Sequence, residues 1–265
     1  GSLTNATEEF TGAGQPVGAW STGGNLNTAR TNIANAGTQT SALGFGGDPA
    51  PTRAFTESYN GTNWTEVGDL NTGRNTMGGS GASNTAALCF GGTISPAVTE
   101  LWNGSNWTEV NDLNTGRLYL SGAGTTTASI AVGGEVPGGN SAVTELWNGT
   151  NWTEVNALNT ARYAGATAGT TTSALTFGGA NPPYANTESW NGTNWTEVAD
   201  LSAAKQAMGA AGTSNTSALG FGGTSPITAN TEQWNGSSWT EVANLSVARR
   251  QSVSYTHLTL PTIYS

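Results

Sequence analysis

The residues in this chain that could do chemistry are its few charged side chains, and most recur at one interval. A basic residue follows a tryptophan by ten positions six times, which uses six of the eight cations: Arg30, Arg74, Arg117, Arg162, Lys205 and Arg249. A ring of such cations could bind an anion. Glutamates recur with the same period, at Glu57, Glu100, Glu145, Glu188 and Glu232. We therefore favour the alternative that each cation pairs with a carboxylate and fixes neighbouring units together.

Two further series of polar residues are candidates for catalysis or metal binding. Glu66, Glu109, Glu154, Glu197 and Glu241 occupy equivalent positions. Acid and base catalysis needs two carboxylates in different environments, so this series does not predict catalysis. Five residues after their tryptophans lie Asp69, Asp112 and Asp200, which could line a central channel and hold a hard cation. Such side chains usually hydrogen-bond to nearby backbone in turns, so they are weak metal candidates and we expect no metal.

No set of residues typical of an enzyme is evident. The one histidine, His257, lies in a C-terminal stretch unlike the rest of the chain. The one cysteine, Cys89, occupies a position that is Gly44 or Ala131 in sister units, which favours a small strand residue over a reactive thiol. No Ser-His-Asp set or metal-ligand cluster is visible. The sequence predicts no catalytic residue, no cofactor and no enzymatic activity.

The amino-acid composition disfavours some classes of binding partner. Charged residues make up 9% of the chain, the net charge is −9, and glycine occurs 38 times. An acidic chain is a poor ligand for nucleic acid or an anionic membrane, and no apolar run is long enough to span a bilayer. We expect a monomer with no nucleic-acid partner and no membrane insertion.

A repeat positions all of these residues. Six tryptophans recur every 43 to 45 residues: Trp20, Trp64, Trp107, Trp152, Trp195 and Trp239. Units of this length bury their apolar faces against neighbours, so we expect these tryptophans to be structural. The unit that begins at Arg74 contains four candidate strands, at 76–82, 85–90, 98–102 and 107–110, and an Asn-Gly hairpin signal joins the last two. Four short strands per unit is typical of a β-propeller blade.

The repeat resembles the Kelch family. The matching elements, over residues 7 to 250, are an apolar strand that ends in Gly-Gly, an aromatic residue, a tryptophan and then Leu-x-x-x-Arg. The resemblance implies a β-propeller. The Asn/Thr/Gly-rich style also loosely resembles propeller proteins of uncultured marine phages, which implies a virion surface or extracellular location. Residues 252–262 resemble a translated sequencing adaptor, which implies a gene from a metagenomic assembly.

The order of strands along the chain predicts how the ring closes. The chain opens with third and fourth strands only, and five complete repeats follow from about 30 to 248. We predict one all-β domain over 1–265, a six-bladed propeller of four-stranded antiparallel blades. Its closing blade combines 3–29 with 249–265, so that N- and C-terminal strands pair in one sheet.

Function should lie in what varies between units. The connections from Gly-Gly to the next strand differ in length and sequence, and loops on a rigid scaffold often bind partners. The candidate binding residues in these loops are Arg53, Pro96, Glu135, Tyr184 and Pro226. We predict a non-catalytic scaffold that binds a protein or glycan on this loop face. The alternative is a carbohydrate-binding lectin or a glycoside-active propeller that uses scattered carboxylates.

Overall fold

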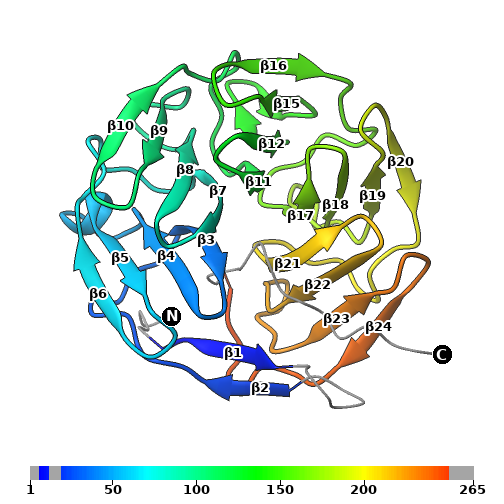
Figure 1. Cartoon of the computed structure of the whole chain (residues 1–265). Coiled ribbons are helices and arrows are strands. Elements are labelled where there is room, and N and C mark those ends of the chain that lie inside the picture. The colour runs from blue at the N-terminus through cyan, green and yellow to red at the C-terminus, as the bar shows by residue number, and fades with distance from the viewer. Residues whose placement is uncertain (1–5, 12–18, 251–265) are drawn as a thin grey trace.

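The computed structural model describes residues 6–11 and 19–250, which form a ring of small antiparallel sheets (Figure 1). Within these residues there are five four-stranded sheets, each built from one repeat. They are β3 (Ala34–Thr38), β4 (Ser41–Phe45), β5 (Thr56–Tyr59) and β6 (Trp64–Val67); β7 (Gly78–Ser83), β8 (Ala86–Phe90), β9 (Thr99–Trp102) and β10 (Trp107–Val110); β11 (Ser121–Thr125), β12 (Ala128–Val132), β15 (Thr144–Trp147) and β16 (Trp152–Val155); β17 (Ala166–Thr170), β18 (Ser173–Phe177), β19 (Thr187–Trp190) and β20 (Trp195–Val198); and β21 (Gly209–Ser214), β22 (Ser217–Phe221), β23 (Thr231–Trp234) and β24 (Trp239–Val242).

Each sheet is a meander in which strands pair in chain order. The first strand lies nearest the ring axis and the fourth lies at the rim (Figure 1). This arrangement defines an all-β β-propeller and confirms the predicted blade. The strands of the unit that begins at Arg74 start and end within two residues of the predicted bounds.

The inner strands are rich in glycine because they approach one another closely around the axis. A Cβ at Gly79 would lie 2.7 Å from the carbonyl oxygen of Asn35 in the preceding blade. A Cβ at Gly122 would lie 2.3 Å from the Phe90 ring. Larger residues are therefore excluded at these positions, and the second strands of the blades supply the apolar bulk.

The Asn-Gly pairs do mark the hairpins between third and fourth strands, although the turns are longer than a two-residue type. Tyr59 pairs with Trp64, which leaves residues 60–63 as the loop. The Asn60 side-chain oxygen accepts hydrogen bonds from the backbone N–H groups of Thr62 and Asn63, at 3.0 and 2.9 Å. Only the glycine needs positive φ, 92° at Gly61. The asparagine therefore stabilises the turn through its side chain.

The prediction of six four-stranded blades is wrong. The described residues hold five such blades, plus a two-stranded sheet of β1 (Glu8–Thr11) and β2 (Ala19–Thr22). Closure of the ring by paired N- and C-terminal strands is not shown by this part of the chain. The N-terminal segment supplies only the sequence of a third and a fourth strand. The segment expected to pair with it, 251–265, lies outside the described residues.

The two-stranded sheet packs on the fifth blade as one full blade packs on another. The indole Nε1 of Trp20 donates to Thr231 Oγ1 at 3.0 Å, and its ring lies 4.9 Å from that of Phe221. Arg249 forms an ion pair with Glu8. On its other side, the sheet reaches the first blade through a hydrogen bond from the Tyr59 hydroxyl to Glu9.

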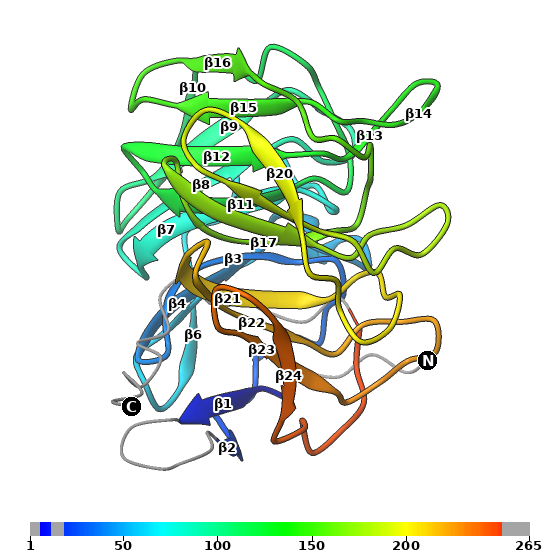
Figure 2. The ribbon, with the colours of Figure 1, turned by 90° about the vertical axis from the view of Figure 1, so that its right-hand side faces the viewer.

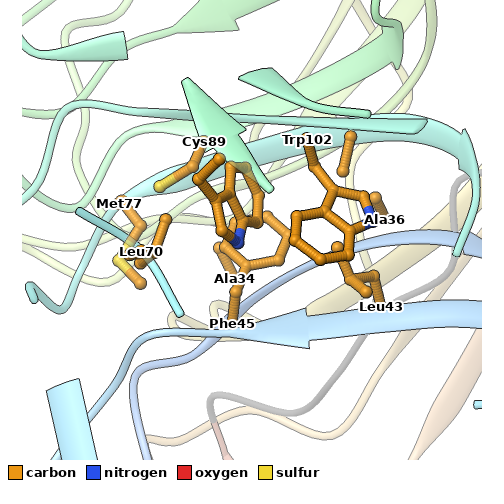
Figure 3. Close-up of a cluster of buried hydrophobic side chains, with 10 residues drawn as sticks. Ala34, Ala36, Leu43, Phe45, Leu70, Met77, Cys89 and Trp102 are labelled. Atoms are coloured by element: carbon orange, nitrogen blue, oxygen red, sulfur yellow. The ribbon is translucent and has the colours of Figure 1, made fainter. Parts of the chain in front are cut away.

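The core lies between blades rather than within them. One cluster combines Ala34, Leu43 and Phe45 of the first blade with Cys89 and Trp102 of the second (Figure 3). Trp107 crosses the same boundary, with its ring 4.9 Å from Phe45 and its Nε1 3.0 Å from Thr56 Oγ1. The same indole-to-threonine bond recurs between later blades from Trp152, Trp195 and Trp239. This is the structural position that the repeat predicts for these residues. Among the described residues, no helix is long and apolar enough to cross a membrane.

Candidate binding face and central pocket

Arg117 is buried and pairs with one of the periodic glutamates, as the ion-pair alternative predicts. Its Nη2 donates to Glu145 Oε1 at 2.9 Å, and both side chains are fully buried. Its Nη1 donates to the carbonyl oxygens of Gly133 and Val143 at 2.8 and 2.7 Å. Burial lowers the pKa of the Arg117 guanidinium, and the adjacent Glu145 opposes this shift. The guanidinium therefore links the Gly-Gly turn to the third strand of its own blade.

Each of the other periodic cations has an acidic partner. The pairs are Arg30 with Glu57 at 2.8 Å, Arg74 with Glu100 at 3.2 Å, Arg162 with Glu188 at 2.7 Å, Lys205 with Glu232 at 2.7 Å, and Arg249 with Glu8. Except for Arg249, whose side chain is 14% exposed, these cations are almost completely buried. Their geometry supports the ion-pair alternative over a ring that attracts an anion.

The same glutamates also accept backbone hydrogen bonds from the segment that connects one blade to the next. Glu145 also accepts from the backbone N–H of Asn114 at 2.7 Å. The backbone N–H of Arg117 donates to the Pro96 carbonyl of the preceding blade at 2.8 Å. The Leu-Asn-Thr-x-Arg segment therefore joins two blades, and these contacts account for its repetition by folding alone.

The weak metal candidates have structural contacts. Asp69, Asp112 and Asp200 each accept a hydrogen bond from the backbone N–H of the threonine that begins a third strand, at 3.3, 3.2 and 3.4 Å. They belong to different blades. Within residues 6–11 and 19–250, no group of three or more His, Cys, Asp or Glu side chains could hold a metal ion. The structure does not bring these aspartates together.

Cys89 is fully buried in the second blade. Burial raises the pKa of its thiol, although the Arg74 guanidinium, with Nη2 3.3 Å from Sγ, acts in the opposite direction. The thiol is neutral and shielded, as expected of a small core residue.

The variable loops lie at one end of the ring. Strands alternate in direction, so the second-to-third and fourth-to-first connections of every blade share a face, which we call the loop face. The short hairpin of β13 (Glu135–Val136) and β14 (Gly139–Asn140) projects from it (Figure 2). The predicted residues are spread around this face, one per blade. Pro96 and Pro226 are exposed, Arg53 pairs with Asp48 at 3.0 Å, and Tyr184 lies over the Arg162 guanidinium.

A pocket of about 130 Å³ opens on the ring axis at this face. It is lined by the beginnings of the first strands and by one equivalent residue from each full blade, two positions after the cation. These residues, which we call the axial ring, are Asn32, Thr76, Tyr119, Ala164 and Ala207. All adopt positive φ, from 51° to 57°. No charged side chain is among the described residues that line the pocket.

Backbone hydrogen bonds connect the axial ring. The N–H of Tyr119 donates to the Thr76 carbonyl at 2.8 Å, and Ala164 donates to Tyr119 at 2.9 Å. The same bond links Thr76 to Asn32 at 3.3 Å and Ala207 to Ala164 at 2.9 Å. Each axial-ring residue is therefore held by the equivalent residue of the preceding blade, so the five occupy equivalent positions around the axis. The side chains differ while the backbone repeats.

Sequence reasoning missed the axial ring. The available signal was variation inside a repeating motif, since the residues two positions after the six periodic cations are, in chain order, Asn, Thr, Tyr, Ala, Ala and Gln. The segment has the same length in each repeat, so differences in loop length do not reveal it. Positive φ cannot be inferred from residue types as unlike as tyrosine and alanine.

Two members of the axial ring, Thr76 and Tyr119, have polar side chains in unusual surroundings. Thr76 is 7% exposed, and its Oγ1 is buried with no hydrogen-bond partner in the described part of the chain. The Tyr119 ring lies 5.6 Å from that of Tyr163. Burial raises the pKa of Tyr119, and the nearby Glu135 carboxylate adds to the shift.

Fold and site together define a β-propeller with a variable loop face around an axial pocket. No known family model matches the sequence, and a search of curated proteins found no match. The Kelch resemblance therefore rests on the repeated motif alone.

Proposed function

We propose that this β-propeller is a non-catalytic binding module that recognises a protein or glycan through its loop face. One observation carries the proposal. The residues that repeat are used in blade packing and ion pairs, whereas those that vary gather at one end of the ring, around a pocket. A rigid scaffold with variable loops is a common way to build a recognition surface.

The exposed groups on the loop face suit contact with a partner. Ile94 and Ile227 are 67% and 50% exposed at the tips of two second-to-third connections. Arg53 and Tyr184 belong to residue types that often dominate binding energy. The Kelch-like motif and the phage-like composition favour a virion-surface or extracellular module that acts as a monomer.

Within this proposal one feature favours a glycan: Tyr119 lines the pocket, and its ring lies 5.6 Å from that of Tyr163. Aromatic rings offer apolar surface with a polar edge, which suits sugars. A glycoside-active propeller would need two carboxylates in one pocket. The described lining contains none, so hydrolysis is an outcome to be tested rather than proposed.

A glycan array and a hydrolysis screen on the same sample test the proposal. The variants Arg53→Ala and Tyr184→Ala alter the loop face. Thr62→Ala and Thr150→Ala alter exposed hairpins at the opposite end of the blades and serve as controls. We expect array binding to fall in the loop variants only. Loss in the controls alone would contradict the assigned face, and release of sugar would contradict the non-catalytic role.

A further inference from the structure

The axial pocket has the size of a single small ring. Its volume is about 130 Å³. An engineered cavity of about 150 Å³ in another protein accepts benzene, whereas one water takes roughly 30 Å³ of liquid. The pocket therefore fits one six-membered ring, or a few waters, and a longer ligand would extend out of it onto the loop face.

The lining favours an uncharged ligand. Its polar side chains are amides, hydroxyls and a phenol, and no charged side chain is among the described lining residues. The periodic cations two residues before Thr76 and Tyr119 are paired with buried glutamates, so they offer no free positive charge. Asp48 and Glu135 lie close enough to Tyr119 to raise its pKa. Their negative charge disfavours an anion, and the lack of a lining carboxylate gives an ammonium group no partner.

The axial ring is also asymmetric. Three consecutive blades contribute the polar side chains of Asn32, Thr76 and Tyr119, whereas the next two contribute the methyl groups of Ala164 and Ala207. The next residue along the chain adds apolar surface on both sides of the ring, at Ile33, Met77, Leu120 and Met208. A ligand with hydroxyl groups on one edge and C–H groups on another matches both sides.

Thr76 supplies an independent indication that this pocket binds a polar ligand. A β-branched residue at φ 57° is a backbone outlier, and such strain gathers at functional sites. Its hydroxyl is buried and lacks a partner in the described residues, an unfavourable arrangement in a folded protein. Rotation about Cα–Cβ redirects the hydroxyl, so that a ligand hydroxyl in the pocket can pair with it.

We infer that the axial pocket is a subsite for one uncharged, hydroxyl-bearing ring of the size of a monosaccharide, held between the polar and apolar sides of the axial ring. The inference rests on the proposed binding function and adds the chemical class of the ligand. The loops would then contact the remainder of a longer glycan.

The test is an NMR titration of the full chain with D-glucose, D-galactose, D-mannose and N-acetylglucosamine. D-Glucuronate and D-glucosamine serve as charged probes of the same ring size. We expect at least one neutral sugar to shift the amide signals of residues 32, 76, 119, 164 and 207, and the charged probes to bind at least ten-fold more weakly. If D-glucuronate bound with the same affinity as the best neutral sugar, the inference would be overturned.

Three variants separate binding from folding. Thr76→Val keeps the shape and removes only an unpaired hydroxyl, so the fold should persist while affinity falls about ten-fold. Ala207→Asn fills the pocket with a residue that tolerates positive φ and occurs naturally at position 32, and it should abolish binding. Thr153→Val on exposed β16 is the matched control and should change nothing. Unchanged affinity in both pocket variants would overturn the inference.

These outcomes also separate the two proposals. If array binding is lost in Arg53→Ala or Tyr184→Ala but kept in the pocket variants, the loop face binds and the pocket inference fails. If neither set of variants alters binding, both proposals fail.

Discussion

Trp152 and Trp64 offer a matched pair for testing how blades hold together. They occupy the same repeat position and are 5% and 4% exposed. Trp152 donates to Thr99 Oγ1 at 3.0 Å and meets the Phe90 ring at 4.9 Å across the blade boundary. Trp64 Nε1 has no partner in the described part of the chain, and its one recorded ring contact there is Tyr59 of its own blade.

The contacts of each tryptophan determine how much unfolding free energy its replacement should cost. Burial of a large apolar side chain contributes about 1.5–3 kcal/mol, an edge-on aromatic pair about 0.5–1.5, and a hydrogen bond about 0.5–1.5. Trp152→Ala should therefore cost about 3–5 kcal/mol of unfolding free energy, in the range of large-to-small core changes. Trp64→Ala lacks the last two contributions and should cost about 1–3 kcal/mol less.

Urea denaturation followed by circular dichroism measures both variants against the unaltered chain. The slope with denaturant should be compared, because a change in slope would show loss of two-state behaviour. Equal losses in the two variants would refute the claim that contacts across the blade boundary, rather than burial alone, stabilise the repeat. So would a larger loss in Trp64→Ala.

Three further predictions concern buried side chains. Arg117→Lys removes the bonds to Gly133 and Val143 and should cost about 1–3 kcal/mol, whereas Lys205→Arg should be neutral or stabilising; urea midpoints that move equally would contradict this. Cys89 should react with a thiol reagent only at the rate of global unfolding, and fast labelling of the folded chain would contradict its burial. Its folded-state pKa is raised, so its contribution to stability is complete below the unfolded thiol pKa of about 8.5 and is lost as pH rises. Cys89→Ala should therefore show a shallower loss of stability above that pH than the unaltered chain, and equal slopes would contradict the shift.

The blade could be predicted from the sequence because its signals are local and repeated. Alternation, Gly-Gly turns and Asn-Gly hairpins each act within a few residues, and the tryptophan spacing sets the unit length. The pairing of Arg117 with a glutamate followed from a shared period, although the period did not identify Glu145 among the series. That choice depends on how the chain crosses from blade to blade.

The number of full blades could not be predicted in the same way. It depends on whether strands distant in the sequence pair, and the terminal segments offered no repeated signal to test this. The axial ring was missed for another reason. Its residues share a backbone conformation and a place on the axis, and neither property follows from side chains as different as Asn32, Tyr119 and Ala207.

The central claim is that this propeller binds through its loop face and axial pocket. Hydrogen–deuterium exchange, with and without a glycan selected on the array, tests it most directly. We expect protection in the second-to-third connections, such as residues 93–98 and 180–186, and in residues 30–35 and 74–79 beside the pocket. Protection confined to the opposite hairpins, such as residues 60–63 and 148–151, would contradict it.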